Sequence, residues 1–268
     1  MNLNGKVIIV TGGTGVLGYS FNKAISKAGG TVCILGRNKE LAEERAGEII
    51  AEGGKAIGLA ADVLNEADLQ KANDIIVEKF GRIDGLVNGA GGNQPKAVIQ
   101  PEEDLFHLDM EALEKVMNLN LFGSLLPTQI FGRTMMATSE AASIVNISSV
   151  SAYSVITKVL GYSLAKSAIE IYTKWFAVEL GKRYGSKIRM NAIMPGFFLT
   201  EQNRALLTNP DGSLTDRGQK VVNKTPMQRF GKPEELCTAL VYLLSEDSSF
   251  VMGSTIGIDG GFTTFSGV

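Results

Sequence analysis

The chain has 268 residues, of which 44% are hydrophobic and 20% charged, and its net charge is −2. These values describe a globular protein without the basic surface that nucleic acids require, and no apolar run reaches the roughly 20 residues of a membrane helix. We therefore expect no nucleic acid and no membrane as partners. The amino terminus has no secretory-signal pattern, which favours the cytoplasm. The two cysteines lack disulfide or metal spacing. His107, the single histidine, is interpreted as an incidental loop residue, so no metal is expected.

Apolar runs of strand length alternate with helical patterns along the whole chain. The predicted strands are KVIIV (6–10), TVCIL (31–35), KAIGLAADV (55–63), IDGLVNGAGG (83–92), ASIVNISS (142–149), KIRMNAIMPG (187–196) and STIGIDGG (254–261). Buried strands separated by helices are typical of a parallel sheet with right-handed crossovers. The pattern predicts an α/β fold, a doubly wound, mostly parallel, seven-stranded Rossmann-like sheet with helices on both faces. No linker or repeat interrupts it, so we expect one domain over residues 1–268.

Two connections are longer than the others, residues 92–109 and residues 197–231. Both follow the carboxyl end of a predicted strand, where ligands bind in sheets of this kind. The second segment is interpreted as a lid over a substrate. A longer helical region is expected after the fourth predicted strand, ending near Met136.

The stretch TGGTGVLG (11–18) contains a G-x-G-x-x-G between the first predicted strand and the first helix. Glycines there let the backbone approach a pyrophosphate, and the helix start offers free N–H groups. The stretch therefore predicts a dinucleotide cradle. The second strand ends in Gly36, Arg37 and Asn38, without the acid that usually binds the ribose of NAD. Arg37 would attract a 2′-phosphate, so NADP is favoured over NAD. The alternative is that Arg37 stacks on the adenine, which would serve either cofactor.

Tyr162 and Lys166 in YSLAK (162–166) have a spacing that places both on one helix face, one turn apart. An ammonium beside a phenol favours the phenolate and lowers the pKa of the phenol toward the working range. Ser149 stands at the carboxyl end of the fifth predicted strand, where its hydroxyl could hold a substrate oxygen. Together these residues predict a general acid/base site.

With these motifs the chain resembles the short-chain dehydrogenase/reductases from end to end. The resemblance implies that Tyr162 is the acid/base and that Lys166 lowers its pKa and binds the ribose. It also implies that Ser149 orients the substrate and that Asn120 supports a water that links Lys166 to solvent. The implied cofactor residues are Gly12, Thr14, Gly15, Val16, Leu17, Gly18, Arg37, Asn38, Asp62, Val63, Asn88, Ala90, Gly91, Tyr162, Lys166, Pro195, Gly196 and Thr200.

Within that set, the resemblance assigns Asp62 to the adenine, Asn88 to anchoring the central strand and Thr200 to the nicotinamide amide. Two positions depart from the family pattern. Val16 replaces a glycine, with Gly15 expected to supply the flexibility one position earlier, and Gly89 replaces an asparagine. The resemblance further implies a homotetramer with contacts near residues 110–136 and 160–184.

Segments outside the general motifs, above all FFLTEQNRALLTNPDGSLTDRG, resemble the D-mannonate oxidoreductases (fructuronate reductases). That resemblance implies reversible reduction of D-fructuronate to D-mannonate. A sugar acid needs a cation and several amides or hydroxyls, and Lys158 is favoured as the cation because it precedes Tyr162 by one turn. The candidate substrate residues are Asn93, Gln94, Gln129, Lys158, Gln202, Asn203 and Arg204. The alternatives are another sugar-acid or polyol reductase, such as a gluconate 5-dehydrogenase, and a dinucleotide-sensing protein without turnover.

Overall fold

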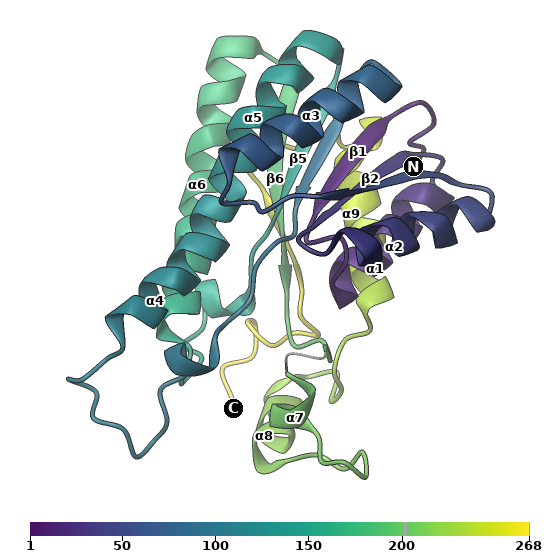
Figure 1. Cartoon of the computed structure of the whole chain (residues 1–268). Coiled ribbons are helices and arrows are strands. Elements are labelled where there is room, and N and C mark those ends of the chain that lie inside the picture. Colours follow the sequence, from purple (N-terminus) through teal and green to yellow (C-terminus); the bar gives the residue numbers. More distant parts are fainter. Residues whose placement is uncertain (201–202, 268) are drawn as a thin grey trace.

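A parallel sheet of seven strands forms the centre of the computed structural model, which describes residues 1–200 and 203–267 (Figure 1). The strand order is β3-β2-β1-β4-β5-β6-β7, so the order of the strands reverses between β1 and β4. The strands are β1 (Val7–Thr11), β2 (Thr31–Gly36), β3 (Lys55–Ala60), β4 (Gly85–Asn88), β5 (Ala142–Ile147), β6 (Ile188–Pro195) and β7 (Thr255–Ile258). All pairings are parallel. The predicted doubly wound fold is confirmed, and a ligand is expected at the reversal point.

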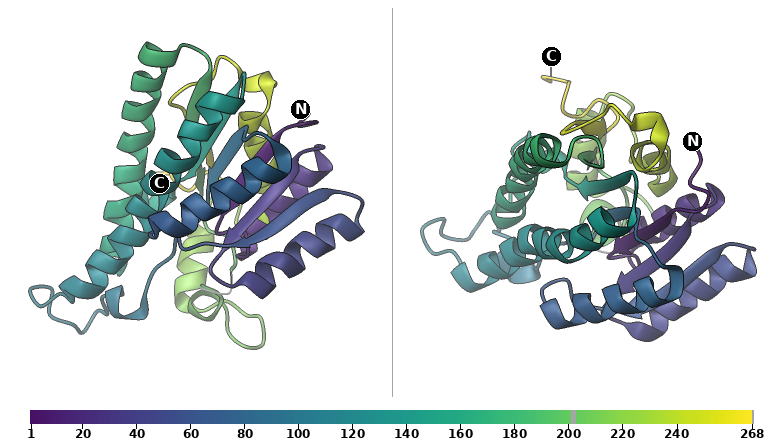
Figure 2. Two further views of the ribbon diagram at one scale, coloured as in Figure 1. Left: turned by 45° about the horizontal axis from the view of Figure 1, so that its top comes forward. Right: turned by 90° about the horizontal axis from the view of Figure 1, so that it is seen from above.

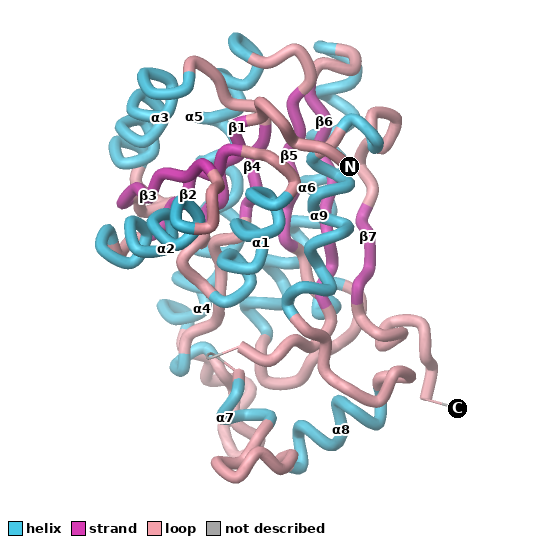
Figure 3. The backbone as a smooth tube through the Cα atoms, turned by 90° about the vertical axis from the view of Figure 1, so that its right-hand side faces the viewer, coloured by secondary structure: helices cyan, strands magenta, loops and turns pink. Residues whose placement is uncertain are grey.

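Helices cover both faces of the sheet (Figures 2 and 3). On one face lie α1 (Val16–Lys27), α2 (Lys39–Ala51) and α9 (Cys237–Leu244), and on the other lie α3 (Glu66–Phe80), α5 (Gly123–Thr138) and α6 (Leu160–Tyr184). Because successive strand residues point to opposite faces, Ile8 and Val10 enter the first apolar core and Val7 and Ile9 the second. In the described residues no helix is both long and apolar enough to cross a membrane.

The longer helical region expected to end near Met136 is present and ends at Thr138. It divides into α4 (Met110–Met117), a single π turn named η2 (Asn118–Phe122) and α5. The amide of Asn120 donates to the carbonyl of Val116, which the backbone N–H of residue 120 would take in a regular α-helix. The turn thus buries the Asn120 side chain beside the carboxyl ends of the strands. π turns of this kind occur often at functional sites.

A row of polar side chains crosses the middle of the sheet. Asn88 and Asn146 are register partners on β4 and β5, and the Asn88 amide donates to Oδ1 of Asn146 at 2.8 Å. The Asn88 amide also donates to Thr128 on α5, and the Asn146 amide donates to Thr173 on α6. All four side chains are buried. Asn88 therefore anchors the central strands to each other and to two helices.

At the opposite end of β4, the buried carboxylate of Asp84 ties three segments together. It accepts hydrogen bonds from the backbone N–H of Val7, the hydroxyl of Ser139 and the guanidinium of Arg82. Burial works to raise the pKa of Asp84, but these hydrogen bonds outweigh it, and the pKa lies below its ordinary value. The network fixes the amino ends of β1 and β4, far from the glycine loop.

The two long connections take different forms. Residues 92–109 contain only the short turn η1 (Pro95–Ala97) before α4 begins. Residues 197–231 carry α7 (Arg204–Leu207) and α8 (Asp216–Lys224), which lie beyond the carboxyl ends of the strands (Figure 1).

Candidate active site

The loop between β1 and α1 has the shape of a phosphate cradle. Gly12 has φ +64°, and a Cβ there would lie 2.8 Å from the Gly89 carbonyl oxygen. A Cβ on Gly18 would collide with the backbone of Gly12. The first turn of α1 is not capped by a side chain, because its N-cap residue is Gly15. The site therefore combines close backbone approach with free helical N–H groups, as a pyrophosphate requires. Of the remaining predicted loop residues, Thr14 lies in this turn, and Val16 and Leu17 begin α1.

The expectation that Gly15 supplies the backbone flexibility that Val16 lacks is wrong. Gly15 has φ −77° and ψ 171°, an extended conformation that any residue adopts. Val16 is the first residue of α1 and is 37% exposed, so its side chain has open space. The valine is tolerated because the chain needs no left-handed backbone at that point. Gly89, the other departure, lies against the end of β1, where a Cβ would be 2.8 Å from the Thr11 carbonyl oxygen.

The end of β2 lies beside this loop. A Cβ on Gly36 would lie 2.7 Å from Cγ2 of Thr14. Arg37 is exposed, and among the described residues its guanidinium has no hydrogen bond or ion pair. Asn38 caps α2 by accepting a hydrogen bond from the Leu41 N–H. Of these predicted residues, Arg37 therefore has a guanidinium that can bind a ligand. The side-chain oxygen of Asn38, in contrast, already accepts the hydrogen bond that caps α2.

The predicted catalytic side chains come together at the carboxyl end of β5. Ser149 follows β5, and Tyr162 and Lys166 lie one turn apart near the start of α6. The Tyr162 phenol has a hydrogen bond with Ser149. The ammonium of Lys166, which is 4% exposed, donates to the Ile147 carbonyl at 2.7 Å and lies 5.4 Å from the centre of the Tyr162 ring. The geometry is that of an acid/base pair with a substrate-orienting hydroxyl.

The pKa of Tyr162 differs in direction from the expectation. Burial raises the pKa of the phenol, and the hydrogen bond with Ser149 works in the opposite direction. Burial also lowers the pKa of Lys166 from 10.5 to about 8. Burial determines the direction of both pKa shifts. Tyr162 packs on an apolar cluster of Ala97, Ala112 and Val116, and the Lys166 ammonium donates to a backbone carbonyl, which carries no compensating charge. The phenol is therefore neutral and able to donate a proton.

Asn120 holds the loop after β4 against Lys166. Its side chain donates to the Gly92 carbonyl at 2.7 Å and accepts from the Gly92 N–H at 3.0 Å. A Cβ on Gly91 would lie 2.6 Å from Oδ1 of Asn120 and 3.6 Å from Nζ of Lys166. Only glycine fits this approach, which explains the residue type at position 91.

The other predicted cofactor residues border the same edge of the sheet. Asp62 is half-buried after β3 and accepts a hydrogen bond from the Leu64 N–H, while Val63 is buried. The N–H of Ala90 donates to the Thr11 hydroxyl. Pro195 ends β6, and a Cβ on Gly196 would lie 2.6 Å from Cα of Asp259. Thr200 is half-buried in the segment that follows. Oδ1 of Asn88 is buried and has no hydrogen-bond partner among the described residues, so it is available to a ligand.

The predicted substrate residues are not all alike in their surroundings. Oδ1 of Asn93 is buried without a hydrogen-bond partner among the described residues, and Gln94 follows it at the start of η1. An orphan acceptor beside the catalytic loop is suited to a substrate hydroxyl. Gln129 is exposed on α5, and the described contacts join it to none of the catalytic residues.

Lys158 has an unusual backbone, with φ +77°. Its ammonium donates to Oε1 of Gln100 at 3.0 Å, and its carbonyl accepts the N–H of Ile99 at 2.9 Å. A left-handed backbone at a non-glycine residue is uncommon and often marks a functional site. Lys158 thus joins the long connection after β4 to the entrance of α6.

The last three predicted substrate residues belong to the segment after β6. Asn203 donates to the Phe198 carbonyl and accepts the Thr200 N–H, so its amide stabilises the turn itself. Arg204 is exposed at the start of α7. Gln202 lies outside the described residues.

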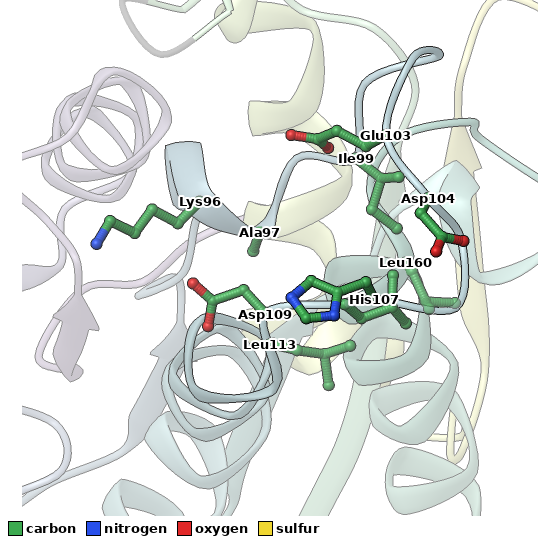
Figure 4. Close-up of a pocket in the computed structure, with 10 residues that line it drawn as sticks. Lys96, Ala97, Ile99, Glu103, Asp104, His107, Asp109, Leu113 and Leu160 are labelled. Atoms are coloured by element: carbon green, nitrogen blue, oxygen red, sulfur yellow. The ribbon is translucent and has the colours of Figure 1, made fainter.

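A cavity of about 390 Å³ lies beside the site, between α4, α6 and the loop after η1 (Figure 4). His107 lies across it, and Lys96 points away from it (Figure 4). Ala97 lines the cavity and also packs against Tyr162. His107 is a loop residue, as expected, and the lining includes none of the catalytic side chains. In the described part of the chain, no group of three or more His, Cys, Asp or Glu side chains could hold a metal ion.

Sequence reasoning missed Thr11. Its hydroxyl accepts the N–H groups of Gly89 and Ala90 and holds the loop after β4 to the end of β1. Its place at the start of TGGTGVLG was the available signal. The contacts of residues 259–267 were also missed.

The chain is similar to known proteins over nearly its whole length. The family model adh_short_C2, described as enoyl-(acyl carrier protein) reductase, matches residues 15–263. An uncharacterized oxidoreductase of Bacillus subtilis (strain 168), UxuB, is 42% identical over an alignment of 276 positions, which covers 100% of this chain and 98% of that protein.

Two solved structures add information about cofactors. One, from Haemophilus influenza, is provisionally named a D-mannonate oxidoreductase and holds NAD; its TM-score is 0.92 at 42% identity, with 100% of this chain and 98% of that chain covered. The other is a gluconate 5-dehydrogenase from Burkholderia cenocepacia J2315 with NADP and tartrate, with a TM-score of 0.86 at 32% identity and coverage of 98% and 97%. The chain therefore belongs to the short-chain dehydrogenase/reductase family, and it is an oxidoreductase that uses a nicotinamide dinucleotide.

Proposed function

We propose that this protein interconverts D-fructuronate and D-mannonate, with NADP(H) preferred over NAD(H). The observation that carries the reaction type is the arrangement of Ser149, Tyr162 and Lys166 beside the glycine loop. The substrate is supported by the residues after β6 that resemble D-mannonate oxidoreductases, and by the provisional name of the 42%-identical structure.

In the direction of reduction, the keto carbon becomes an alcohol by gaining a hydride and a proton. When bound, the reduced nicotinamide supplies the hydride. Ser149 holds the keto oxygen by a hydrogen bond, and Tyr162 donates its phenolic proton to that oxygen. The Lys166 ammonium, held by the Ile147 carbonyl, stabilises the phenolate that remains. Asn120 keeps the loop after β4 in contact with Lys166 and supports the water path to solvent.

The glycine loop, from Gly12 to Gly18, would hold the pyrophosphate, with Asp62 at the adenine and Thr200 at the nicotinamide amide. The preference for NADP is supported by Arg37, whose guanidinium is exposed and unpaired among the described residues. No acidic residue stands at positions 36–38 to repel a 2′-phosphate. Replacing Arg37 by alanine should raise the KM for NADPH by about tenfold or more and leave that for NADH nearly unchanged. Equal changes for both cofactors would assign Arg37 to the adenine instead.

The sugar acid would be held by Asn93, whose orphan oxygen accepts a hydroxyl, and by Lys158 at its carboxylate. Lys158 stands four residues before Tyr162, just ahead of the start of α6 at Leu160, which limits how far it can lie from the phenol. Its present partner is a neutral amide, which a carboxylate can replace. Losing Lys158 should raise KM for the acid far more than for a neutral ketone, and equal losses on both would contradict this role. Residues 197–231 are proposed to cover the substrate.

We propose a homotetramer from exposed apolar side chains on α6 and on the π turn η2, which leads into α5. Phe122 precedes α5 and is 51% exposed, and Ile171 and Trp175 on α6 are 64% and 60% exposed. Side chains of this size on adjacent helices mark a surface that a partner covers, and a second copy of the chain is the simplest partner.

The function is tested by adding D-fructuronate, or 5-dehydro-D-gluconate as the alternative substrate, to the protein with NADPH or NADH. Consumption of the reduced cofactor is followed by absorbance. Turnover of D-fructuronate that is abolished in Tyr162→Phe supports the proposal. Faster turnover of 5-dehydro-D-gluconate than of D-fructuronate would assign the protein to the gluconate 5-dehydrogenases. Binding of the cofactor without turnover of either compound would favour a sensor.

A further inference from the structure

The C-terminal tail (residues 259–267) begins against the turn that follows β6. The N–H of Gly196 donates to the Ile258 carbonyl at 2.9 Å, and the backbone of Asp259 leaves no room for a Cβ on Gly196. Gly196 belongs to the predicted cofactor site, so the tail starts directly beside that site.

The tail next reaches the loop that carries Ser149. Phe262 is 6% exposed and packs in one apolar cluster with Val150 and Met194. Its ring centre lies 5.2 Å from that of Phe197, at the start of the segment after β6. Because Val150 directly follows Ser149, the position of the Ser149 loop depends on the volume of Phe262.

The tail also holds the carboxyl end of α8. The ammonium of Lys224, the last residue of α8, donates to the Phe265 carbonyl at 2.5 Å. Nζ of Lys224 lies 6.0 Å from the ring centre of Phe262 and 5.5 Å from that of Phe265, within cation–π range. One side chain therefore makes three contacts to the tail.

The motif DGG (259–261) gives the tail its shape. The Asp259 carboxylate accepts the N–H groups of Gly261 and Thr263 and the Thr263 hydroxyl. Gly260 and Gly261 have φ +63° and +88°, where side chains are strained. A Cβ on either glycine would also lie 2.8 to 2.9 Å from a side-chain carbon of Thr225 or Pro226, the two residues after α8. The motif thus brings the tail into direct contact with the base of α8.

A cavity of about 440 Å³ is lined by Thr225 and Met227 from the residues after α8, by Phe198, and by Gly260 and Gly261. Near its start α8 packs against α7, where a Cβ on Gly218 would collide with the Leu207 carbonyl oxygen, whereas the tail contacts its carboxyl end.

We propose that the C-terminal tail is a positioning element, which holds α8, the Ser149 loop and the Pro195–Gly196 turn in one arrangement, with Lys224 and Phe262 as its positioning residues. Neither side chain reacts. They act by setting the places of Ser149 and of the segment after β6. The effect of the tail on the KM of the sugar acid rests on the proposed function, whereas its effect on the order of α8 does not.

The test compares Lys224→Met, Lys224→Arg and the matched control Lys220→Met, an exposed lysine on the same helix. Amide hydrogen exchange is measured on the full-length protein without ligands. Exchange in α8 should rise by about tenfold in Lys224→Met, because a hydrogen bond donated by a charged group is worth about that factor or more. Lys224→Arg should restore protection, and Lys220→Met should match the wild type. Exchange in α8 that is unchanged in Lys224→Met, or equally raised in the control, overturns the proposal.

A kinetic arm adds a readout that a merely structural role would not move. With the substrate that turns over, Lys224→Met should raise the KM of the sugar acid several-fold, with kcat and the KM of the cofactor nearly unchanged. A fall in kcat alone would contradict the positioning of α8. Residues 150–153 should stay protected from amide exchange in Phe262→Leu and lose protection in Phe262→Ala. Equal protection in both variants would contradict the contact between Phe262 and the Ser149 loop. If the wild type turns over neither sugar acid, the proposed function fails, and the exchange data still decide the role of the tail.

Discussion

Replacing Lys166 by methionine separates the chemical role of the buried ammonium from its effect on stability. Burial lowers the pKa of Lys166 from 10.5 to about 8. Each pKa unit is worth about 1.4 kcal/mol, so carrying the charge at neutral pH destabilises the folded state by about 3 kcal/mol. Methionine has a similar length and no charge. It loses the hydrogen bond to the Ile147 carbonyl, which offsets about 1–3 kcal/mol of the gain.

The dependence on pH isolates the charge from the hydrogen bond. Below about pH 8 both folded and unfolded lysine are protonated, and the wild type bears the full destabilisation. Between about pH 8 and pH 10.5 only the unfolded state binds the proton, so the stability of the wild type rises with pH. The free energy of unfolding of Lys166→Met, relative to the wild type, should therefore fall by about 3 kcal/mol across this range.

Urea unfolding, followed by the fluorescence of Trp175, measures this difference at fixed protein concentration. Lys174→Met, which removes an exposed ammonium from the same helix, is the control and should show no such dependence. Turnover by Lys166→Met should fall by about 10² to 10⁴. A stability difference that stays constant between about pH 7 and pH 10 would refute the argument that burial governs Lys166.

Three further outcomes are expected. Asp84→Ala should lower the free energy of unfolding by about 3–5 kcal/mol, because it leaves buried donors unpaired. Since the pKa of Asp84 is lowered in the folded state, the stability that its carboxylate contributes is present above the ordinary pKa of 3.8 and is lost as pH falls further. Thermal melts in which Asp84→Ala loses the same stability at all pH values would contradict this. Gly12→Ala should weaken dinucleotide binding at least about tenfold in calorimetry, because its Cβ would lie 2.8 Å from a carbonyl oxygen, while Gly47→Ala on α2 has open space and should bind normally. Trp175→Glu should reduce the mass in sedimentation, and an unchanged mass would place the subunit contacts elsewhere.

The sheet could be predicted because its signal is local. Apolar runs such as VIIVT are buried on both faces and differ in composition from the helices between them. The ends of the strands were harder to place. The strand predicted for residues 55–63 ends at Ala60, because Asp62 begins a turn by accepting the Leu64 N–H. The π turn at residues 118–122 depends on a side chain that replaces a backbone donor, which periodicity does not reveal.

The catalytic residues could be predicted because helical spacing and strand ends fix where Tyr162, Lys166 and Ser149 meet. What could not be predicted depends on tertiary packing. The direction of the Tyr162 pKa follows from apolar neighbours that come from other segments. The left-handed backbone of Lys158 follows from its contacts with the loop after β4. The contact of Lys224 with Phe265 joins residues 41 positions apart and has no sequence pattern of its own.

The paired amides of Asn88 and Asn146 have a consequence for how the strands find their partners during folding. The neighbouring positions on β4 and β5 are Leu, Val and Ile, and apolar residues of similar size can replace one another across a sheet with little loss. An amide has no such substitute. A shift of one strand by two residues would keep the same side chains facing inward but separate the two amides and set one of them against Ile144 or Leu86, at about 1–3 kcal/mol for every buried donor or acceptor that loses its partner. The pair therefore destabilises shifted alignments of β4 and β5 that apolar contacts alone would tolerate.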